Sequence, residues 1–214
     1  MILIIENDKI YDINSKEVVM LDYERKYKGK IIAGIDEAGR GPLAGPVVCA
    51  CVIMPLDDEN IIEGINDSKK LSEKKRNELE ALIKEKAIAY SVVEIDEKVI
   101  DEINILNATK LGMKKALEDL KIKPDVVLID AVKIDTELTQ ENIIKGDALS
   151  YNIASASILA KVYRDRLMCE LDKKYPKYSF AKHKGYGTKI HIQALKEYGK
   201  CPIHRESFIK KILN

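Results

Sequence analysis

The stretch that most constrains the fold is residues 31–48, where an apolar run meets two adjacent acids and then a turn rich in glycine and proline. The apolar run at 31–35 predicts a strand that is buried on both faces. Asp36 and Glu37 end this strand, and buried carboxylates are costly unless a cation or hydrogen bonds satisfy them. A second apolar run at 47–54 predicts another strand. We therefore expect a strand–loop–strand unit that carries a functional site.

The loop between these strands carries Gly39, Gly41 and Gly45, a spacing that loosely resembles a dinucleotide-binding fingerprint. Two acids beside a pyrophosphate would repel it, Pro42 removes an amide that should bind phosphate, and no helix follows the loop. These features argue against a dinucleotide site. Glycines at such a position instead let the backbone approach a ligand closely.

The rest of the chain alternates between helical and extended patterns. Caps and apolar periodicity predict helices at 15–27 with Ser15 as N-cap, at 73–87 with Ser72 as N-cap, at 101–121, at 150–174, and from Thr188 to Tyr198. Apolar runs and short extended patterns predict further strands at 89–95, 126–131 and 142–145. Within the helix at 101–121 we expect an inward-facing set of Leu106, Leu111, Ala116, Leu117 and Leu120.

Asp130 ends a second apolar strand. Two strands that each deliver a carboxylate at their ends indicate a site more strongly than either alone, although a salt-bridge or capping role for Asp130 stays open. Asp147 precedes the helix at 150–174, and it is either part of the same site or only the cap of that helix. Lys69 belongs to a tandem lysine pair that either contacts a phosphate backbone or lies in a solvated turn.

Charge is distributed unevenly along the chain. Residues 161–214 hold 14 Lys and Arg against five Asp and Glu, although the net charge of the whole chain is only +1. A basic carboxy-terminal quarter suits a polyanionic partner such as nucleic acid, or else consists of solvated helix faces. Within it, Tyr186 stands between two glycines in a basic loop, a combination that suits backbone phosphates and a stacking contact with a nucleotide.

Composition limits the class of protein. With 214 residues, of which 46% are hydrophobic and 33% charged, the chain is typical of a globular protein with a real core. No apolar run approaches the ~20 residues needed to cross a bilayer, and the amino terminus lacks the basic region of a secretory signal. The four cysteines include no CxxC pair for structural zinc and suit packing. We therefore expect a cytoplasmic protein without a membrane partner, and a monomer by default.

The acids limit the chemistry. Carboxylates without a paired histidine or cysteine favour hard divalent cations, and Mg²⁺ or Mn²⁺ takes oxygen ligands of this kind. Two such ions can clamp the attacking and leaving oxygens of an in-line displacement at phosphorus. No Ser-His-Asp order, HExxH motif or Walker A loop offers another chemistry. Beside a basic surface, Asp36, Glu37, Asp130 and Asp147 therefore point to a metal-dependent nuclease.

Eight segments together carry a distinctive pattern. They are Gly34–Val48, Asp67–Leu71, Asn104–Thr109, Ile129–Ala131, Lys145–Asp147, Ala156–Asp165, His183–Thr188 and Cys201–Phe208. This set resembles the signature of the type 2 ribonucleases H, the ribonuclease HII family, over about residues 18–208, and its first segment alone is highly specific. Departures are small: Ile190 stands where many relatives carry an acid, and Tyr163 replaces a common threonine.

The resemblance implies a ribonuclease H-like α/β fold, with a mixed five-stranded sheet flanked by helices and a small helical carboxy-terminal part. It implies a single domain over 1–214, in which 1–30 form an amino-terminal extension with a helix and about 176–214 form a substrate-binding part. The residues that match the family's metal-binding, catalytic acids are Asp36, Glu37, Asp130 and Asp147. Those that match its substrate-binding positions are Gly39, Arg40 and Gly41, which read the junction through their backbone, and the sugar-stacking Tyr186. Lys69, from the tandem lysine pair, is a further candidate for substrate binding.

The resemblance also implies an activity. Similar enzymes use Mg²⁺ or Mn²⁺ to cut the RNA strand of RNA–DNA hybrids, and they nick duplex DNA 5′ of an embedded ribonucleotide, the first step of ribonucleotide excision repair. Their products carry 3′-hydroxyl and 5′-phosphate ends. One alternative is a ribonuclease HIII-like enzyme, although the roughly 30 residues before Ile31 leave no room for its extra domain. Another is a catalytically silent hybrid-binding module, against which the four acids argue because they would repel phosphates.

Overall fold

The structure is a computed structural model that describes residues 3–6, 9–12 and 18–213. Five strands form the main sheet in the order β6-β5-β4-β7-β8. β4 is antiparallel to β5 and parallel to β7, while β5 is antiparallel to β6 and β7 is parallel to β8. These strands are β4 (Ile32–Ala38), β5 (Val47–Ile53), β6 (Ala89–Ile95), β7 (Val126–Asp130) and β8 (Thr139–Ile143). The predicted mixed five-stranded sheet is therefore confirmed.

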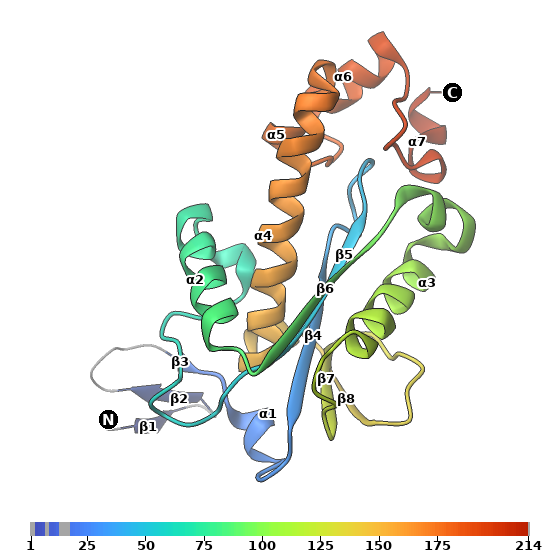
Figure 1. Cartoon of the computed structure of the whole chain (residues 1–214). Helices are drawn as coiled ribbons and strands as arrows, with labels where there is room; N and C mark the ends of the chain where they lie inside the picture. The colour runs from blue at the N-terminus through green and yellow to red at the C-terminus, as the bar shows by residue number, and fades with distance from the viewer. Residues whose placement is uncertain (1–2, 7–8, 13–17, 214) are drawn as a thin grey trace.

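Helices flank this sheet (Figure 1). The long helix α4 packs on β4 and β5 with α2 beside it, whereas α3 packs on β5 and β6. The helical segments are α1 (Asp22–Arg25), η1 (Ser68–Lys70), α2 (Glu73–Lys86), α3 (Glu97–Glu118), η2 (Gly146–Ala148), α4 (Tyr151–Lys174), η3 (Pro176–Tyr178), α5 (Phe180–His183), α6 (Lys189–Tyr198) and α7 (Glu206–Leu213).

Strand β5 divides the core into two layers. Its side chains alternate between the two faces of the sheet, as in any strand. Ala50 and Val52 belong to the cluster beneath α2 and α4, whereas Cys49 and Cys51 belong to the cluster beneath α3. All residues of β5 are buried, which explains its continuous apolar sequence.

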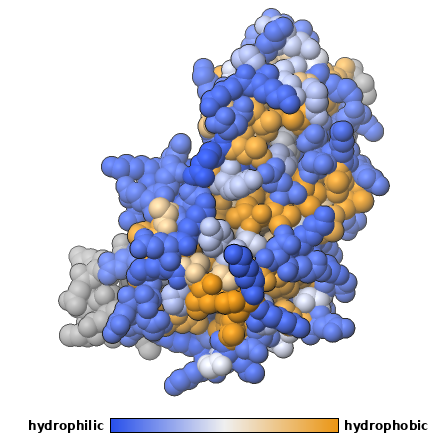
Figure 2. All heavy atoms as spheres, in the orientation of Figure 1, coloured by the Kyte–Doolittle hydropathy of each residue, from blue (hydrophilic) through white to orange (hydrophobic). Residues whose placement is uncertain are grey.

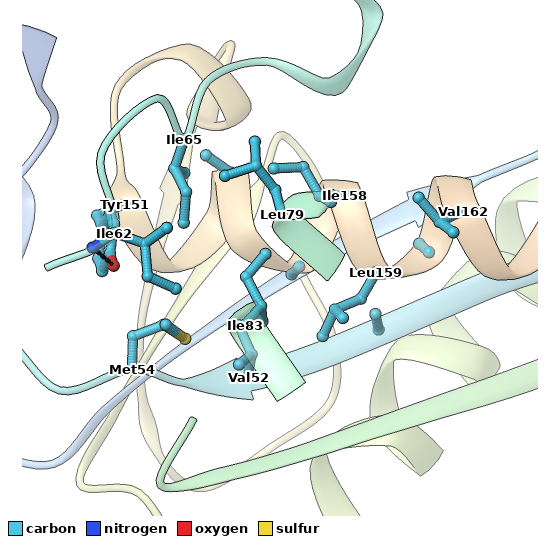
Figure 3. Packing of buried hydrophobic residues seen from close by; sticks show 14 of the residues in the cluster. Val52, Met54, Ile62, Ile65, Leu79, Ile83, Tyr151, Ile158, Leu159 and Val162 are labelled. Atoms are coloured by element: carbon cyan, nitrogen blue, oxygen red, sulfur yellow. Dashed lines mark hydrogen bonds between the residues drawn. The ribbon is translucent and has the colours of Figure 1, made fainter. Parts of the chain in front are cut away.

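Figure 3 shows how the cluster beneath α2 and α4 is packed. Leu79 and Ile83 of α2 point toward α4, where Ile158 is among their neighbours. The Tyr151 hydroxyl accepts a hydrogen bond from Ile62 N at 2.8 Å, which ties the start of α4 to the loop after β5. Burying an aliphatic side chain of this size contributes about 1.5–3 kcal/mol, so this cluster holds α4 firmly on the sheet.

The cysteines of β5 are packing groups, as their sequence context predicts. Burial raises the pKa of the Cys49 thiol and of the Cys51 thiol, and all four cysteines of the chain are free. Cys49 Sγ donates to Thr109 O at 3.6 Å, and a Cβ on Gly112 would lie only 2.7 Å from this sulfur. Gly112 therefore allows α3 to approach β5 closely.

Several predicted elements are confirmed almost to the residue. β5, α2, β6, α4 and α6 each begin and end within one residue of the predicted bounds. The predicted caps form as well: Ser72 Oγ accepts from Lys75 N at 3.2 Å, and Thr188 Oγ1 accepts from His191 N at 3.4 Å. These signals are local in sequence, which is why the sequence reveals them.

The predicted helix at 15–27 is wrong over much of its length. Val18 and Val19 lie in a strand, and helix α1 covers only Asp22–Arg25; the predicted cap Ser15 lies outside the described residues. A small antiparallel sheet consists of β1 (Leu3–Glu6), β2 (Lys9–Asp12) and β3 (Val18–Val19). Consecutive β-branched residues favour a strand when a partner strand is present, and the helical pattern did not reveal that partner.

Helix α3 also departs from the prediction. It begins at Glu97 instead of 101, because the Asp96 side chain caps it by accepting from Val99 N at 2.9 Å. Asn104 interrupts the helix with a φ of 66° and caps the continuing part with its own side chain. Leu106, at this break, is 43% exposed and does not face inward as predicted. The short strand predicted at 142–145 lies earlier, as β8.

The predicted helical carboxy-terminal part is present as η3 and α5 to α7. A separate hydrophobic cluster that includes Met168, Tyr178 and Phe180 fastens it to the end of α4. Hydrophilic side chains cover its outer edge in Figure 2, in keeping with the excess of Lys and Arg in this part of the chain. Among the described helices, none combines the length and apolarity that a bilayer crossing requires.

Candidate active site

Two neighbouring parallel strands bring Asp36 and Asp130 together. Ile35 of β4 is paired with Ile129 of β7, so the next residue of each strand is an acid at the same edge of the sheet. β4 continues through Asp36 and Glu37 to Ala38, further than predicted. Asp36 is buried, with 5% of its surface exposed, and its Oδ1 accepts from Glu37 N at 2.7 Å.

Asp147 joins this group through strand β8. After β8 the chain turns at Lys145, whose φ is 60°, and enters η2. The turn places Gly146 N 2.8 Å from Asp130 Oδ1, to which it donates. Asp147 is 6% exposed. The N-cap of α4 is Ser150, whose Oγ accepts from Ile153 N, so the alternative that Asp147 is the cap of this helix is wrong.

The four carboxylates act on one another electrostatically. Burial raises the pKa of Asp36 well above its ordinary value, and the charges of Glu37 and Asp130 raise it further. Burial also raises the pKa of Glu37, against the opposing effect of Arg40, whose Nη1 lies 3.7 Å from Glu37 Oε1. The pKa of Asp147 is raised by burial and by nearby acids, including Asp130. The fold thus holds these acids close together at an energetic cost.

Lys69 partly neutralises this negative group. Its Nζ lies 3.3 Å from Asp147 Oδ2. The turn that carries it is ordered, because Ser68 N donates to Ser157 Oγ of α4 and Arg76 Nη1 donates to Ser68 O at 3.0 Å. The backbone of this turn is therefore anchored to α4, while the Lys69 side chain itself is 77% exposed to solvent.

The acids border a cavity of about 260 Å³ together with the glycine-rich loop. Its lining consists of Asp36, Glu37, Ala38, Gly39, Arg40, Gly41, Ser68, Lys69, Asp130, Lys161, Arg164 and Tyr186. Of the nine residues predicted for the site, only Asp147 is missing from this lining, and it reaches the group through its contact with Lys69. Lys161 and Arg164 were not predicted for the site, although their spacing on α4 puts them on one helix face.

The glycines of this loop have different environments. Gly39 has a φ of +98°, and a Cβ there would lie 2.0 Å from Arg164 Nε. Gly45 has a φ of +82°, and a Cβ there would lie 2.5 Å from Met168 Sδ. A Cβ on Gly41 would meet only Tyr186 Cε1, at 3.6 Å. The prediction that the glycines leave room for a ligand therefore fits Gly41, whereas the space beside Gly39 and Gly45 is filled by the protein itself.

Tyr186 is held at the cavity through its backbone. Gly185 O accepts from Leu43 N at 2.8 Å, which joins this segment to the glycine-rich loop. Tyr186 O lies 3.0 Å from His191 Nδ1, and His191 Nε2 lies 3.0 Å from His204 Nε2. The Tyr186 side chain itself is 46% exposed, so its ring is available for a contact with a ligand.

The oxygens of the four carboxylates do not converge on one position among the described residues. Within residues 3–6, 9–12 and 18–213, no three side chains of Asp, Glu, His or Cys are arranged to hold a metal ion as they stand. Asp130 accepts from Gly146 N and Asp147 pairs with Lys69, which engages one oxygen of each carboxylate. Glu37 Oε2, by contrast, is buried and has no hydrogen-bond partner among the described residues.

Comparison with known proteins identifies the family. The family model for ribonuclease HII matches residues 33–211. The ribonuclease HII of Caldicellulosiruptor bescii is 62% identical over 187 residues, which are 86% of this chain and 89% of that protein. The ribonuclease HII of Acetivibrio thermocellus is 59% identical over 192 residues, which are 89% of this chain and 73% of that protein.

Solved structures agree with this comparison. The ribonuclease H2 from Pyrococcus horikoshii OT3 has a TM-score of 0.72 and 28% identity, and the match covers 85% of this chain and 96% of that one. A ribonuclease HIII structure has a TM-score of 0.56 at 18% identity, which is a likeness of fold alone. Since the family model spans most of the chain and relatives are more than half identical to it, the chain belongs to the ribonuclease HII family, whose members are ribonucleases H.

Proposed function

We propose that the chain cuts the RNA strand of RNA–DNA hybrids and nicks duplex DNA on the 5′ side of an embedded ribonucleotide. The observation that carries this proposal is the shared cavity, where Asp36, Glu37 and Asp130 lie beside the Gly39–Gly41 backbone and Tyr186. Groups suited to a metal ion and groups suited to a ribose thus border the same space. The membership of the ribonuclease HII family supports the same substrate class.

The acids fit a divalent cation such as Mg²⁺ or Mn²⁺. Asp36, Glu37, Asp130 and Asp147 offer only oxygen donors, the ligands that these ions prefer. Burial and mutual repulsion raise the pKa of Asp36, and Glu37 Oε2 is buried without a partner in the described part of the chain. A cation held by these four side chains would relieve both costs. Asp36, Glu37, Asp130 and Asp147 would hold such ions, which when bound would supply activation of a water and charge stabilisation for the departing 3′-oxygen, in keeping with 3′-hydroxyl and 5′-phosphate ends.

The loop and Tyr186 would select which phosphate reaches the acids. The 2′-hydroxyl is the group by which a protein distinguishes RNA from DNA. Gly41 is exposed, and the only neighbour that a Cβ there would meet is Tyr186 Cε1 at 3.6 Å, so its peptide is available to a 2′-hydroxyl. The Tyr186 ring against the next sugar would favour deoxyribose, which carries no 2′-hydroxyl. Arg40 and Lys69, both exposed at the rim, would bind the phosphates on either side.

A labelled DNA duplex with one ribonucleotide, incubated with Mn²⁺ or with EDTA, tests this function. We expect a metal-dependent nick 5′ of the ribonucleotide, and its loss in Asp130→Asn. The matched control is Asp135→Asn, because Asp135 is an exposed carboxylate that pairs only with Lys114 among the described residues. Thermal unfolding with and without Mn²⁺ reports metal binding independently, and Asp130→Asn should lose most of the stabilisation.

Two outcomes would contradict the proposal. A 2′,3′-cyclic phosphate product would show that the 2′-hydroxyl is the nucleophile, which excludes hydrolysis by an activated water. Tight binding of the hybrid without any cleavage, in the presence of Mg²⁺ or Mn²⁺, would favour the silent hybrid-binding module.

A further inference from the structure

Arg205 holds the glycine-rich loop from beneath. Its side chain is completely buried, and it follows a bridge that pairs His204 with Ala44. The guanidinium donates from Nε to Gly45 O (2.9 Å), from Nη1 to Arg40 O (2.9 Å) and Pro42 O (2.8 Å), and from Nη2 to Gly39 O (2.6 Å). One side chain therefore binds four carbonyls of the loop.

Arg164 of α4 holds the rest of the loop and joins it to Tyr186. It is 1% exposed, and its Nε and Nη2 donate to Pro46 O (3.0 Å) and Ala44 O (3.1 Å). Its Nη1 donates to Lys184 O (3.0 Å), two residues before Tyr186. The same guanidinium thus contacts both segments that border the substrate cavity.

These contacts leave one carbonyl of the loop without a hydrogen bond among the described residues. Since Arg205 N also donates to Leu43 O at 2.9 Å, the carbonyls of 39–46 are all hydrogen-bonded within the described chain except that of Gly41. Gly41 is also the loop glycine whose Cβ would meet only Tyr186, at an ordinary contact distance of 3.6 Å from Cε1. The two arginines therefore determine where this peptide lies.

The arginines also place charge beneath the loop. Neither guanidinium forms an ion pair with a described carboxylate. Burial lowers the pKa of Arg164 to about 10, and burial together with the charge of Arg164 lowers the pKa of Arg205 to about 9. Both remain positive at neutral pH. Two positive charges without an ion-pair partner among the described residues therefore lie next to the loop that the proposed function assigns to nucleic acid.

We propose that Arg205, assisted by Arg164, is a positioning residue for ribonucleotide recognition: its guanidinium sets the distance between the Gly41 peptide and the Tyr186 ring. The inference rests on the proposed function, because it assigns Gly41 and Tyr186 to substrate. A lysine at 205 keeps the charge, but a single ammonium with three donors cannot reach four carbonyls in the planar arrangement of a guanidinium. Charge and geometry are therefore separable by experiment.

The experiment measures the dissociation constants of Arg205→Lys for two duplexes, one with a single ribonucleotide and one of DNA alone, by fluorescence anisotropy in Ca²⁺. We expect the preference for the ribonucleotide to fall by about tenfold, the change in dissociation constant that corresponds to the loss of about one hydrogen bond to the 2′-hydroxyl. Affinity for the DNA duplex should change little, because the positive charge is kept.

Controls separate positioning from general loss of stability. Tyr178→Phe removes a hydrogen bond to Gly199 O (2.9 Å) in the same carboxy-terminal part and should leave the preference unchanged. Arg166→Lys alters an exposed arginine of α4 that pairs with Glu80, and it should also leave the preference unchanged. If Arg205→Lys does not fold, Arg164→Lys is measured instead, with the same expected loss.

The outcomes distinguish the two proposals. A wild-type protein with no preference for the ribonucleotide would overturn the proposed reading of the 2′-hydroxyl, and the role of Arg205 with it. A wild-type protein with a clear preference that Arg205→Lys fully retains would overturn the positioning role alone. A loss of preference in Tyr178→Phe as large as that in Arg205→Lys would show that stability alone is responsible.

Discussion

Gly39 and Gly41 test the assignment of the glycine-rich loop, because alanine at Gly39 disturbs the fold whereas alanine at Gly41 does not. Both would gain one methyl group on replacement by alanine, yet the methyl groups meet different surroundings. In Gly39→Ala the new Cβ would lie 2.0 Å from Arg164 Nε at a residue with a φ of +98°. In Gly41→Ala it would lie 3.6 Å from Tyr186 Cε1, an ordinary contact, and it would enter the substrate cavity.

The two substitutions should therefore differ in stability. A left-handed backbone costs a residue with a Cβ roughly 1–2 kcal/mol, and displacing Arg164 loses at least one charged hydrogen bond, worth about 1.5–3 kcal/mol. Gly39→Ala should thus lower the free energy of unfolding by about 3 kcal/mol or more, or about 6–12 °C in melting temperature for a chain of this size. Gly41→Ala should change it by no more than about 1 kcal/mol in either direction.

Catalysis should fall in both variants, since Gly39→Ala displaces Arg164, but only in Gly41→Ala should it fall without a loss of stability. In Gly41→Ala the methyl group stands where a ribose would meet the peptide, and we expect kcat/KM on a single-ribonucleotide duplex to fall on the order of 10²-fold. Urea denaturation gives the stabilities, and steady-state nicking gives the rates. Wild-type kcat/KM in Gly41→Ala would refute the assignment of Gly41 to substrate, and wild-type stability in Gly39→Ala would refute the packing argument.

Three further predictions concern single side chains. Asp36→Asn removes the charge whose burial and repulsion by neighbouring acids raise the pKa of Asp36. Its melting temperature in EDTA should therefore rise, while cleavage and stabilisation by Mn²⁺ are lost. A lower melting temperature in EDTA would contradict the repulsion. Tyr186→Ala removes a half-exposed ring, so it should weaken nicking at a single ribonucleotide and leave Mn²⁺ binding intact; unchanged steady-state nicking would remove Tyr186 from the site. Burial lowers the pKa of His204 to about 4, below the ordinary value of about 6.5, so the unfolded chain binds more protons and stability should fall as the pH drops from about 6.5 toward 4. The raised pKa values of Asp36, Glu37 and Asp147 act in the opposite direction, so the contribution of His204 is measured as the difference between wild type and His204→Gln in urea denaturation at pH 7 and pH 5. The same change in stability between these pH values in both proteins would contradict the argument.

Local signals in the sequence predicted most of the main sheet. Continuous apolar runs placed β5 and β7, and the Ser72 cap placed the start of α2, because the residues that decide these elements are neighbours in the chain. The helix predicted at 15–27 failed for the opposite reason: Val18 and Val19 pair with β2, a tertiary contact that periodicity does not record. Asn104 likewise breaks α3 at a place where the apolar pattern continues.

The candidate site was predicted by residue type but not by arrangement. Asp36, Glu37 and Asp130 stand at the ends of apolar strands, so their cost when buried could be recognised in the sequence. The difference between Gly39 and Gly41 could not, since it depends on Arg164, which lies far along the chain. Arg164 itself was missed because arginine is rarely fully buried, and nothing local predicts that backbone carbonyls will surround it.

The contacts of Arg205 have a consequence for the order in which the enzyme is assembled. Arg205 lies 166 positions after Gly39, whose carbonyl it binds. During synthesis all four acidic residues are therefore added to the chain before Arg205, whose side chain orders the loop beside them. The loop to which we assign the discrimination of RNA from DNA is therefore ordered only after Arg205 has been added, when all four acids are already part of the chain.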